Sequence, residues 1–165
     1  MQRKCLEPWI DQNAHILIVG TMPSEKSLNE QTYYANPRNK FWEYITNILN
    51  DGNKLCSIEE KKSFLKKCQI GLWDSLAFCE REGNSDSKIK AEIFNDFTPF
   101  ETIKYVIFNG KKAAKYSFKY NALFLSKRNC FKLPSTSSAN TSLSDKDKFE
   151  KWKETFLEIL KNEND

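Results

Sequence analysis

The order of apolar and polar residues along the chain predicts strands that alternate with helices. Residues 15–20 (His-Ile-Leu-Ile-Val-Gly) form a short, continuously apolar run rich in β-branched residues, which is typical of a buried strand. Residues 105–108 have the same character and are followed by Asn-Gly, a turn signal. Shorter apolar runs predict further strands at residues 72–78, 122–125 and 130–133.

Four segments have the apolar spacing or the end signals of helices. Apolar residues recur on one helical face within residues 39–50. Residues 57–68 open with the Ser-x-x-Glu spacing of a capping box, and residues 111–119 are rich in Ala and Lys. Ser144 is placed to cap a final helix. The apolar stripe of this last helix consists of Phe149, Trp152, Phe156, Ile159 and Leu160.

This alternation favours an α/β fold. We expect a single domain over residues 1–165, built as a three-layer sandwich with a central, largely parallel sheet flanked by helices. Ligands of such sheets bind beyond the carboxyl ends of the strands. The loops that follow Val19, Phe108 and Leu133 are therefore the places to search for a site. Residues 80–90 are polar and are predicted to form a loop.

The composition is ordinary for a globular protein, with 39% hydrophobic and 29% charged residues. No apolar run approaches the ~18 residues of a membrane span, and no signal-peptide core is present, so we expect a cytoplasmic protein without a membrane partner. The five cysteines are scattered without a C-x-x-C pair, and His15 is the only histidine. We therefore expect free, buried thiols, no metal site and no cofactor.

The chain has a net charge of +4, but its basic residues are unevenly distributed. Residues 102–143 contain eight Lys and Arg residues and no Asp or Glu. Such a basic half favours a polyanionic partner. A solvated, lysine-rich surface has the same composition, so composition alone leaves both alternatives open.

Two loops contain long motifs that composition does not explain. The loop after the first predicted strand reads Gly20-Thr21-Met22-Pro23-Ser24 and continues through Tyr33-Tyr34 to Pro37-Arg38-Asn39-Lys40-Phe41-Trp42. The loop after the last predicted strand reads Leu133-Pro134-Ser135-Thr136-Ser137-Ser138-Ala139-Asn140. These loops resemble the first and second active-site motifs of the uracil-DNA glycosylase superfamily, and the extended first motif resembles its hypoxanthine-DNA glycosylase branch. Segments between them, including Gly71-Leu72-Trp73-Asp74, are also similar, so the resemblance spans nearly the whole chain.

The resemblance implies an enzyme that hydrolyses the bond between deoxyribose and a deaminated base, above all hypoxanthine, in DNA. It marks Asn39 as the catalytic residue. The base-binding residues that it implies are Gly20, Thr21, Met22, Pro23, Ser24, Tyr34, Phe41 and Asn109. Candidate DNA-binding residues are Arg38, Lys111, Lys112, Arg128, Ser135, Thr136, Ser137, Ser138 and Asn140. We expect a monomer whose partner is DNA with deaminated or mismatched bases.

Three residues depart from the pattern of the family. Asn36 stands where the family usually has His, and Ser138 stands where it usually has Pro. Met22 occupies the place of a catalytic Asp or Asn in many superfamily members, and its thioether neither takes up a proton nor orients water. The hypoxanthine branch shares this last substitution, which moves the catalytic burden to Asn39.

Two roles fit Asn39. In a catalytic role its amide oxygen orients the attacking water, but the amide does not titrate near neutral pH and is no general base. The reaction is then dissociative, and the departing base does much of the work. In a structural role Asn39 caps the helix that begins beside it, because Asn is a favoured N-cap residue. Residue type alone favours the cap, whereas the motif favours catalysis.

Tyr34 also has two roles. Its ring can stack on a base that has been flipped out of the duplex, or it can pack in the core beside Trp42.

Hypoxanthine offers O6 and N7 as acceptors, and backbone amides in residues 20–24 can satisfy them. Gly20 and Pro23 shape that turn.

Other functions are weighed against this one. A first alternative is the same reaction on uracil or on a mismatched pyrimidine. The volume of the pocket decides which of these bases is accepted. A second is a non-catalytic nucleic-acid-binding module, which Met22 and Asn36 favour. A small-molecule nucleotide-binding domain is disfavoured, because no G-x-G-x-x-G or P-loop spacing occurs.

Overall fold

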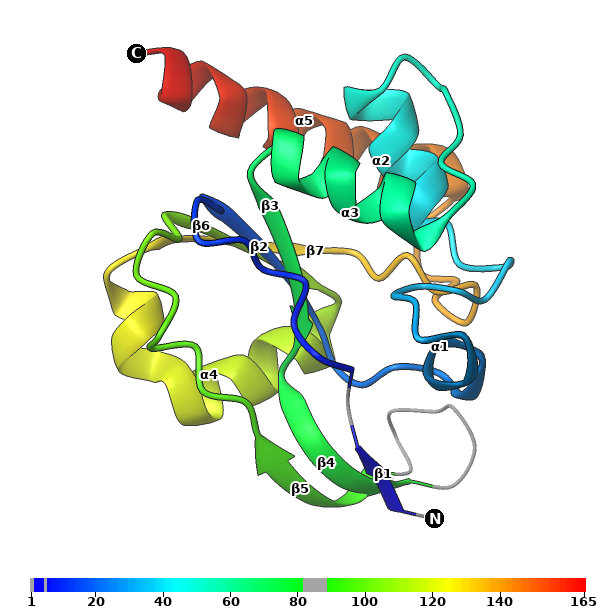
Figure 1. The fold of residues 1–165 in the computed structure, drawn as a ribbon, viewed down its shortest axis with the longest axis vertical. Helices are drawn as coiled ribbons and strands as arrows, with labels where there is room; N and C mark the ends of the chain where they lie inside the picture. The colour runs from blue at the N-terminus through cyan, green and yellow to red at the C-terminus, as the bar shows by residue number, and fades with distance from the viewer. Residues whose placement is uncertain (1, 5, 82–88) are drawn as a thin grey trace.

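The centre of the protein is a four-stranded parallel sheet in the order β3-β2-β6-β7 (Figure 1). The structure is a computed structural model that describes residues 2–4, 6–81 and 89–165, with side chains described for residues 6–77 and 93–165. The strands of the sheet are β2 (Ile16–Gly20), β3 (Ile70–Asp74), β6 (Tyr105–Asn109) and β7 (Asn129–Leu133).

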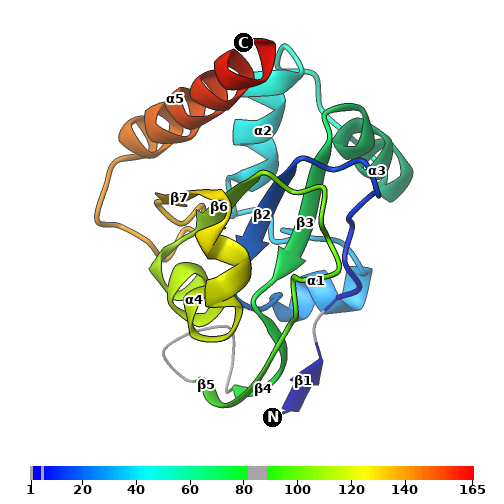
Figure 2. The same cartoon turned by 90° about the vertical axis from the view of Figure 1, so that its left-hand side faces the viewer.

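Helices cover both faces of this sheet (Figures 1 and 2). One face carries α2 (Phe41–Leu49), α3 (Ile58–Lys67) and α5 (Asp145–Asn164), and the other carries α4 (Lys111–Ser126). Successive residues of a strand point to opposite faces, and β2 shows the result. Ile16 and Ile18 join the core under α2, α3 and α5, whereas Leu17 and Val19 join the core under α4. The expected layers of helix, parallel sheet and helix are therefore present.

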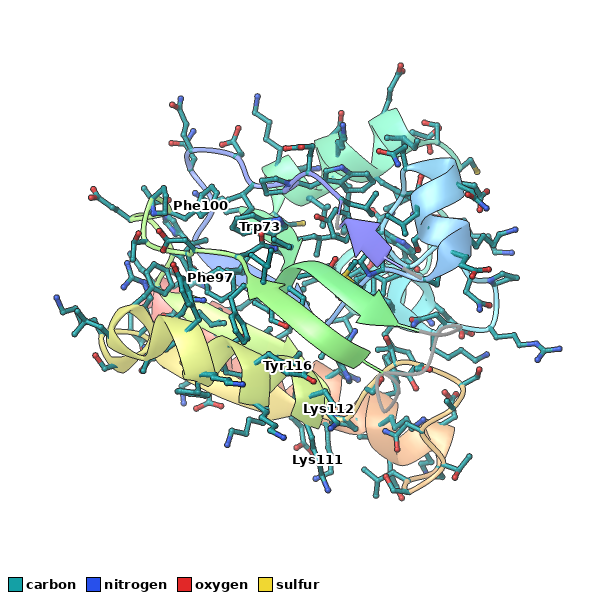
Figure 3. The ribbon with its side chains drawn as sticks, turned by 90° about the horizontal axis from the view of Figure 1, so that it is seen from below. Trp73, Phe97, Phe100, Lys111, Lys112 and Tyr116 are labelled. Carbon is teal, nitrogen blue, oxygen red and sulfur yellow. The ribbon has the colours of Figure 1, made fainter. Side chains whose placement is uncertain are left out.

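A second, antiparallel sheet lies below the first, in the order β1-β4-β5 (Figure 1). Its strands are β1 (Gln2–Lys4), β4 (Leu76–Arg81) and β5 (Ile89–Phe94). The chain passes from β3 to β4 at Ser75, which is fully buried and donates its N–H to the Gly20 carbonyl over 2.8 Å. Above this sheet, Trp73 contacts the rings of Phe97 and Phe100 (Figure 3).

Two predicted strands were wrong. Residues 72–78 are not one strand, because the chain changes sheets at Ser75 and becomes β3 and β4. Residues 122–125 belong to α4, which is longer than the predicted helix over residues 111–119. Buried residues of this helix recur at helical spacing, namely Ala113, Ala114, Ser117, Phe124 and Leu125.

A kink at Asn121 explains why the sequence pattern predicted a helix shorter than α4. Asn121 has the non-helical angles φ −107° and ψ 26°. Its side chain accepts a hydrogen bond from Phe97 N–H at 2.9 Å and donates one to the Asn95 carbonyl at 2.9 Å. The kink thus attaches the helix to the segment that joins β5 to β6.

Three elements were not predicted: β1, β5 and the short helix α1 (Glu25–Glu30). The predicted loop at 80–90 was wrong at both ends, because β4 reaches Arg81 and β5 begins at Ile89; the rest of it, residues 82–88, lies outside the described residues. The other predicted strands and helices occur within a few residues of their expected bounds. In the stripe of α5, however, Leu160 is exposed.

The cysteines differ in part from expectation. Cys56, Cys68 and Cys130 carry free thiols, but Cys56 is exposed and the other two are half-buried. The side chains of Cys5 and Cys79 lie outside the described ones. No helix among the described residues is long and apolar enough to cross a membrane.

Candidate active site

A pocket of about 160 Å³ opens at the carboxyl ends of β2, β3 and β6, where the resemblance places the active site. Both sequence motifs contribute to its walls. The lining residues are Gly20, Thr21, Met22, Pro23, Ser24, Ser27, Tyr33, Tyr34, Asn36, Asn39, Asp74, Asn109, Ser135, Ser137 and Ser138. Loops 90 or more residues apart in sequence therefore meet at one edge of the sheet.

The turn after β2 is anchored to the start of β4. The Gly20 carbonyl accepts the N–H of Ser75 at 2.8 Å, and the Thr21 carbonyl accepts the N–H of Leu76 at 3.2 Å. A Cβ atom on Gly20 would lie 2.6 Å from Asp74 Oδ1 and 3.1 Å from the Tyr34 hydroxyl oxygen. Only glycine lets these two polar groups approach the backbone so closely.

Asp74 is a pocket residue that sequence reasoning did not assign. Its side chain is 3% exposed and lines the pocket at the end of β3. A signal was available, because Asp74 directly follows an apolar run in a segment that resembles the family. The predicted strand over residues 72–78 puts Asp74 inside a strand, whereas β3 ends at Asp74.

Tyr34 forms one wall of the pocket. Its backbone is left-handed, with φ 55°, and its ring stacks on Phe41 with centroids 4.1 Å apart and planes 27° apart. Burial raises the pKa of the hydroxyl, the charge of Asp74 raises it further, and Asn109 opposes the shift. Tyr34 is therefore neutral at any physiological pH and offers an uncharged ring to the pocket.

Asn39 uses its amide oxygen twice within the protein. Oδ1 accepts the N–H of Phe41 at 3.0 Å, at the first turn of α2, and the hydroxyl of Thr136 at 2.8 Å. An amide oxygen has two lone pairs, so both are engaged. The expectation that this oxygen orients water does not fit the arrangement, because no acceptor site remains on it.

Thr136 and Asn109 fix the direction of this hydrogen-bond chain. The Thr136 N–H donates to Asn109 Oδ1 at 2.9 Å, which leaves Asn109 Nδ2 to donate to Thr136 Oγ1 at 2.9 Å. The Thr136 hydroxyl must then donate its own proton, and Asn39 Oδ1 receives it. The chain thus orients Asn39 with its Nδ2 donor free of hydrogen bonds to the described residues.

Three comparisons show which known proteins this chain resembles. The family model of the uracil DNA glycosylase superfamily matches residues 7–161. The chain is 35% identical over 151 residues to a hypoxanthine DNA glycosylase of Methanosarcina acetivorans, which covers 89% of this chain and 93% of that protein. It is 37% identical over 120 residues to a hypoxanthine DNA glycosylase of Methanosarcina barkeri, with coverages of 70% and 76%.

The chain belongs to the uracil DNA glycosylase superfamily. A solution NMR structure of a Methanosarcina acetivorans protein, described as a "putative Uracil DNA glycosylase", matches with a TM-score of 0.81 at 34% identity. The match covers 94% of this chain and 97% of that one. The expected family and the α/β fold class are therefore confirmed.

Two predicted base-binding residues of this superfamily member contribute mainly through packing. Phe41 is fully buried and supports Tyr34 from the core without lining the pocket. Met22 lines the pocket, but its side chain packs against Leu76 and Tyr116. Both residues therefore shape the pocket through packing.

The second superfamily motif divides into lining and supporting residues. Ser135, Ser137 and Ser138 line the pocket. Thr136 was predicted to contact DNA, but it is 1% exposed and belongs to the internal hydrogen-bond chain. Asn140 donates from Nδ2 to the Ser135 carbonyl at 3.3 Å, which holds the loop in its conformation.

Of the residues predicted to contact phosphates, some are exposed and one is used within the fold. Arg38, Lys111 and Lys112 are exposed, and Figure 3 shows the two lysines extending away from the ribbon where α4 begins. Arg128 lies beyond the opposite end of α4. Its guanidinium donates to the carbonyls of Ile103 and Phe124 at 2.9 and 2.8 Å, so Arg128 serves the fold instead of the DNA-facing edge.

Metal ligands are not gathered in the part of the chain whose side chains are described. No three His, Cys, Asp or Glu residues lie close enough there to hold an ion. The pocket offers hydrogen-bonding amides, hydroxyls and one carboxylate, and these groups set the chemistry considered below.

Proposed function

We propose that this superfamily member is a DNA glycosylase that hydrolyses the N-glycosidic bond of a flipped hypoxanthine and leaves an abasic site. Family membership supports the DNA glycosylase activity, and the names of the two Methanosarcina relatives support the lesion. The observation that carries the proposal is the pocket itself, where Asp74, Tyr34 and Asn39 face one space.

The pocket offers a partner for each side of the base. The Asp74 carboxylate accepts the N1–H of hypoxanthine, and backbone N–H groups of the turn after β2 donate to O6. Tyr34 stacks on one face of the base, where it takes the place of the neighbouring base pair. Adenine has an acceptor at N1 and a donor at position 6, so it would face both groups with the wrong polarity. A buried polar group left unpaired costs about 1–3 kcal/mol, which opposes the binding of adenine.

Bond cleavage places positive charge on the sugar and negative charge on the departing base. Asn39 contributes its Nδ2 donor, the one polar atom of its side chain not used within the described residues. A donor that is already oriented stabilises the departing base without reorganisation at the moment of reaction. Neither Asn39 nor Met22 can take a proton from water, so the proposed reaction is dissociative. The glycosidic bond breaks first, water then adds to the sugar cation, and the proton that this water loses goes to the departing base.

Uracil is the second candidate substrate. Its N3–H and O4 present the same donor and acceptor as N1–H and O6 of hypoxanthine, so the contacts with Asp74 and the turn serve both bases. The structural relative described as a uracil DNA glycosylase points in the same direction.

The test is base release from labelled duplexes that each carry hypoxanthine, uracil, xanthine or adenine at one position. Alkali then cleaves the abasic sites, and the products are separated by length. We expect cleavage with hypoxanthine and none with adenine. Cleavage of the uracil duplex alone would move the assignment to the second candidate, and tight binding without any product would identify a non-catalytic binding module.

The proposal includes a monomer that acts in the cytoplasm. One chain supplies every residue of the pocket, so no second copy is needed to complete it. Size-exclusion chromatography with light scattering tests the oligomeric state, and a dimer would contradict this part of the proposal.

A further inference from the structure

A second, larger pocket of about 500 Å³ lies beside the first. It is bounded by the loop that leads to α2, by α2 itself and by the segment between α2 and α3. Its lining residues are Tyr34, Ala35, Asn36, Pro37, Asn39, Lys40, Trp42, Glu43, Thr46, Asn47, Gly52, Lys54, Leu55 and Lys61. We call it the lysine pocket. Pockets that hold small-molecule ligands have volumes of roughly 300–1,000 Å³, so the size suits a nucleotide unit.

The two pockets share a wall. Tyr34, Asn36 and Asn39 line both of them. A ligand in the lysine pocket therefore touches the other side of the residues that contact a base in the first pocket. Ligands bound in the two pockets would therefore lie next to each other.

The lysine pocket carries an excess of positive charge. Lys40 pairs with Glu43 at 3.1 Å. Within the part of the chain whose side chains are described, no carboxylate forms an ion pair with Lys54 or Lys61. Two ammonium groups are thus available to an anion.

Lys61 is held in place before any ligand arrives. Its Nζ lies 5.1 Å from the centroid of the Trp42 ring, over the ring face. The indole is fixed in turn by a hydrogen bond from Nε1 to the Tyr33 carbonyl at 2.7 Å. Burial lowers the pKa of Lys61, and the charge of Glu30 opposes this shift. An anion bound in the pocket would stabilise the charged form of Lys61 further.

We propose that the lysine pocket binds a backbone phosphate of the lesion-bearing DNA strand, next to the flipped nucleotide, through Lys54 and Lys61. The inference rests on the proposed function, because that function brings a DNA strand to the shared wall. Lysine binds phosphate as a point charge without strict geometry, which suits a contact that grips the backbone and reads no sequence. The phosphate positions the strand so that the flipped base enters the first pocket.

Binding is measured by fluorescence anisotropy on a duplex that contains 2′-fluoro-deoxyinosine. Fluorine destabilises the cationic transition state, so this substrate stays intact during the titration. The variant Lys54→Gln/Lys61→Gln is compared with Lys151→Gln/Lys153→Gln, which removes the same charge from the exposed side of α5. We expect the first variant to bind about tenfold more weakly at low salt and to lower the log–log salt slope by about 1. The α5 variant should match the wild type.

A scan of the lesion strand identifies the phosphate. One phosphate at a time is replaced by an uncharged methylphosphonate, and affinity is measured for the wild type and for the Lys54→Gln/Lys61→Gln variant. We expect one position near the lesion to weaken wild-type binding strongly, and the same replacement to have no further effect in the variant. Lys54 is exposed, so Lys54→Gln alone repeats the test with little risk to the fold.

Three outcomes would overturn the inference. Equal affinities and salt slopes for the pocket variant and the wild type would show that these lysines do not contact DNA. Equal losses at every methylphosphonate position would show a diffuse charge effect without a phosphate site. Inorganic phosphate that binds the wild type and fails to compete with the duplex would assign the pocket to a free anion. The proposed function is judged separately by base release, since these titrations need no cleavage.

Discussion

Asn39 lies between the start of α2 and the pocket. The N-cap of α2 is Lys40, so the expectation that Asn39 is the N-cap was wrong by one residue. Asn39 precedes the cap, and its Oδ1 still accepts the N–H of Phe41, the first residue of α2, while its Nδ2 forms no hydrogen bond to the described residues. A structural role and the proposed role toward a ligand therefore use different atoms of one side chain. This division makes them separable by substitution.

Asn39→Asp retains the acceptor oxygen and removes the donor. The carboxylate still accepts from Phe41 and Thr136, but an oxygen replaces Nδ2 and repels the negative charge of the departing base. We expect single-turnover base release to fall about 10²–10³-fold in both Asn39→Ala and Asn39→Asp. Thermal melting should separate them, because only Asn39→Ala leaves the N–H of Phe41 and the hydroxyl of Thr136 without their acceptor, at a cost of about 1–3 kcal/mol. Near-normal rates in both folded variants would show that Asn39 acts only through its hydrogen bonds within the protein.

Tyr34 is expected to act through its ring. Phe41 already covers one face of the ring at 4.1 Å, and the residue lines the pocket. Base–aromatic stacking contributes about 1–3 kcal/mol, so Tyr34→Ala should reduce kcat/KM roughly ten- to a hundredfold. Tyr34→Phe keeps the ring and should retain most activity. Equal losses in both variants, measured on the same hypoxanthine duplex, would assign the function to the hydroxyl and contradict stacking.

Three structural elements are tied together at the hydrogen bonds of Thr136. The loop after β7 supplies Thr136, the end of β6 supplies Asn109, and the start of α2 supplies Asn39. A further bond runs from Lys40 N–H to the Thr136 carbonyl at 3.0 Å. Thr136 is buried and links the second motif to the first through these bonds, so we expect it to position Asn39.

Removal of the Thr136 hydroxyl should affect stability and rate together. Thr136→Val removes the Thr136 hydroxyl as a partner of Asn109 Nδ2 and of Asn39 Oδ1, so one proton of Nδ2 and one lone pair of Oδ1 lose their hydrogen bond inside the protein. Buried unpaired groups cost about 1–3 kcal/mol, so the urea midpoint should fall, and single-turnover release should slow because Asn39 is no longer held. Thr136→Ser keeps the hydroxyl and should restore both values. A stable Thr136→Val variant with normal turnover would show that the hydrogen-bond chain does not position Asn39.

Sequence patterns predicted well those elements whose local signals agree with their final environment. The run at 15–20 is apolar because β2 is buried on both faces, and Ser57 and Ser144 cap the helices that they were expected to cap. The patterns failed where a distant contact decides the conformation. Asn121 bends α4 because its side chain bonds the segment after β5, a contact that no local spacing records.

The same limit applies to the pocket. Motif residues were placed at the correct edge of the sheet, since the carboxyl ends of parallel strands meet there. Which member of a motif faces the pocket depends on side-chain direction, so Thr136 and Phe41 were assigned to ligands although both are buried. Asp74 was missed because the change of sheet at Ser75 depends on a contact with Gly20.

Across the whole molecule the basic stretch at 102–143 does not form one face. Lys111 and Lys112 stand at the start of α4, directly after the pocket residue Asn109, whereas Arg128 follows its end. A helix of 16 residues separates these ends by roughly 24 Å. The positive charge that lies beside the pocket is therefore smaller than the charge of the whole stretch at 102–143.

This distribution gives a prediction for binding to DNA. Charge reversal in Lys111→Glu/Lys112→Glu should weaken binding to lesion-bearing and undamaged duplexes alike, because phosphate contacts carry no sequence information. Each lost contact should also lower the log–log salt slope by about 0.9. Lys127→Glu/Arg128→Gln serves as the comparison at the far end of α4, and its affinity for DNA should change little. Its stability should fall, because Arg128 loses its hydrogen bonds to the Ile103 and Phe124 carbonyls. Anisotropy titrations between low and moderate salt measure both quantities. If the far-end variant weakened binding as much as the one beside the pocket, the DNA path would run along the whole of α4, and the pocket edge would not be the main contact.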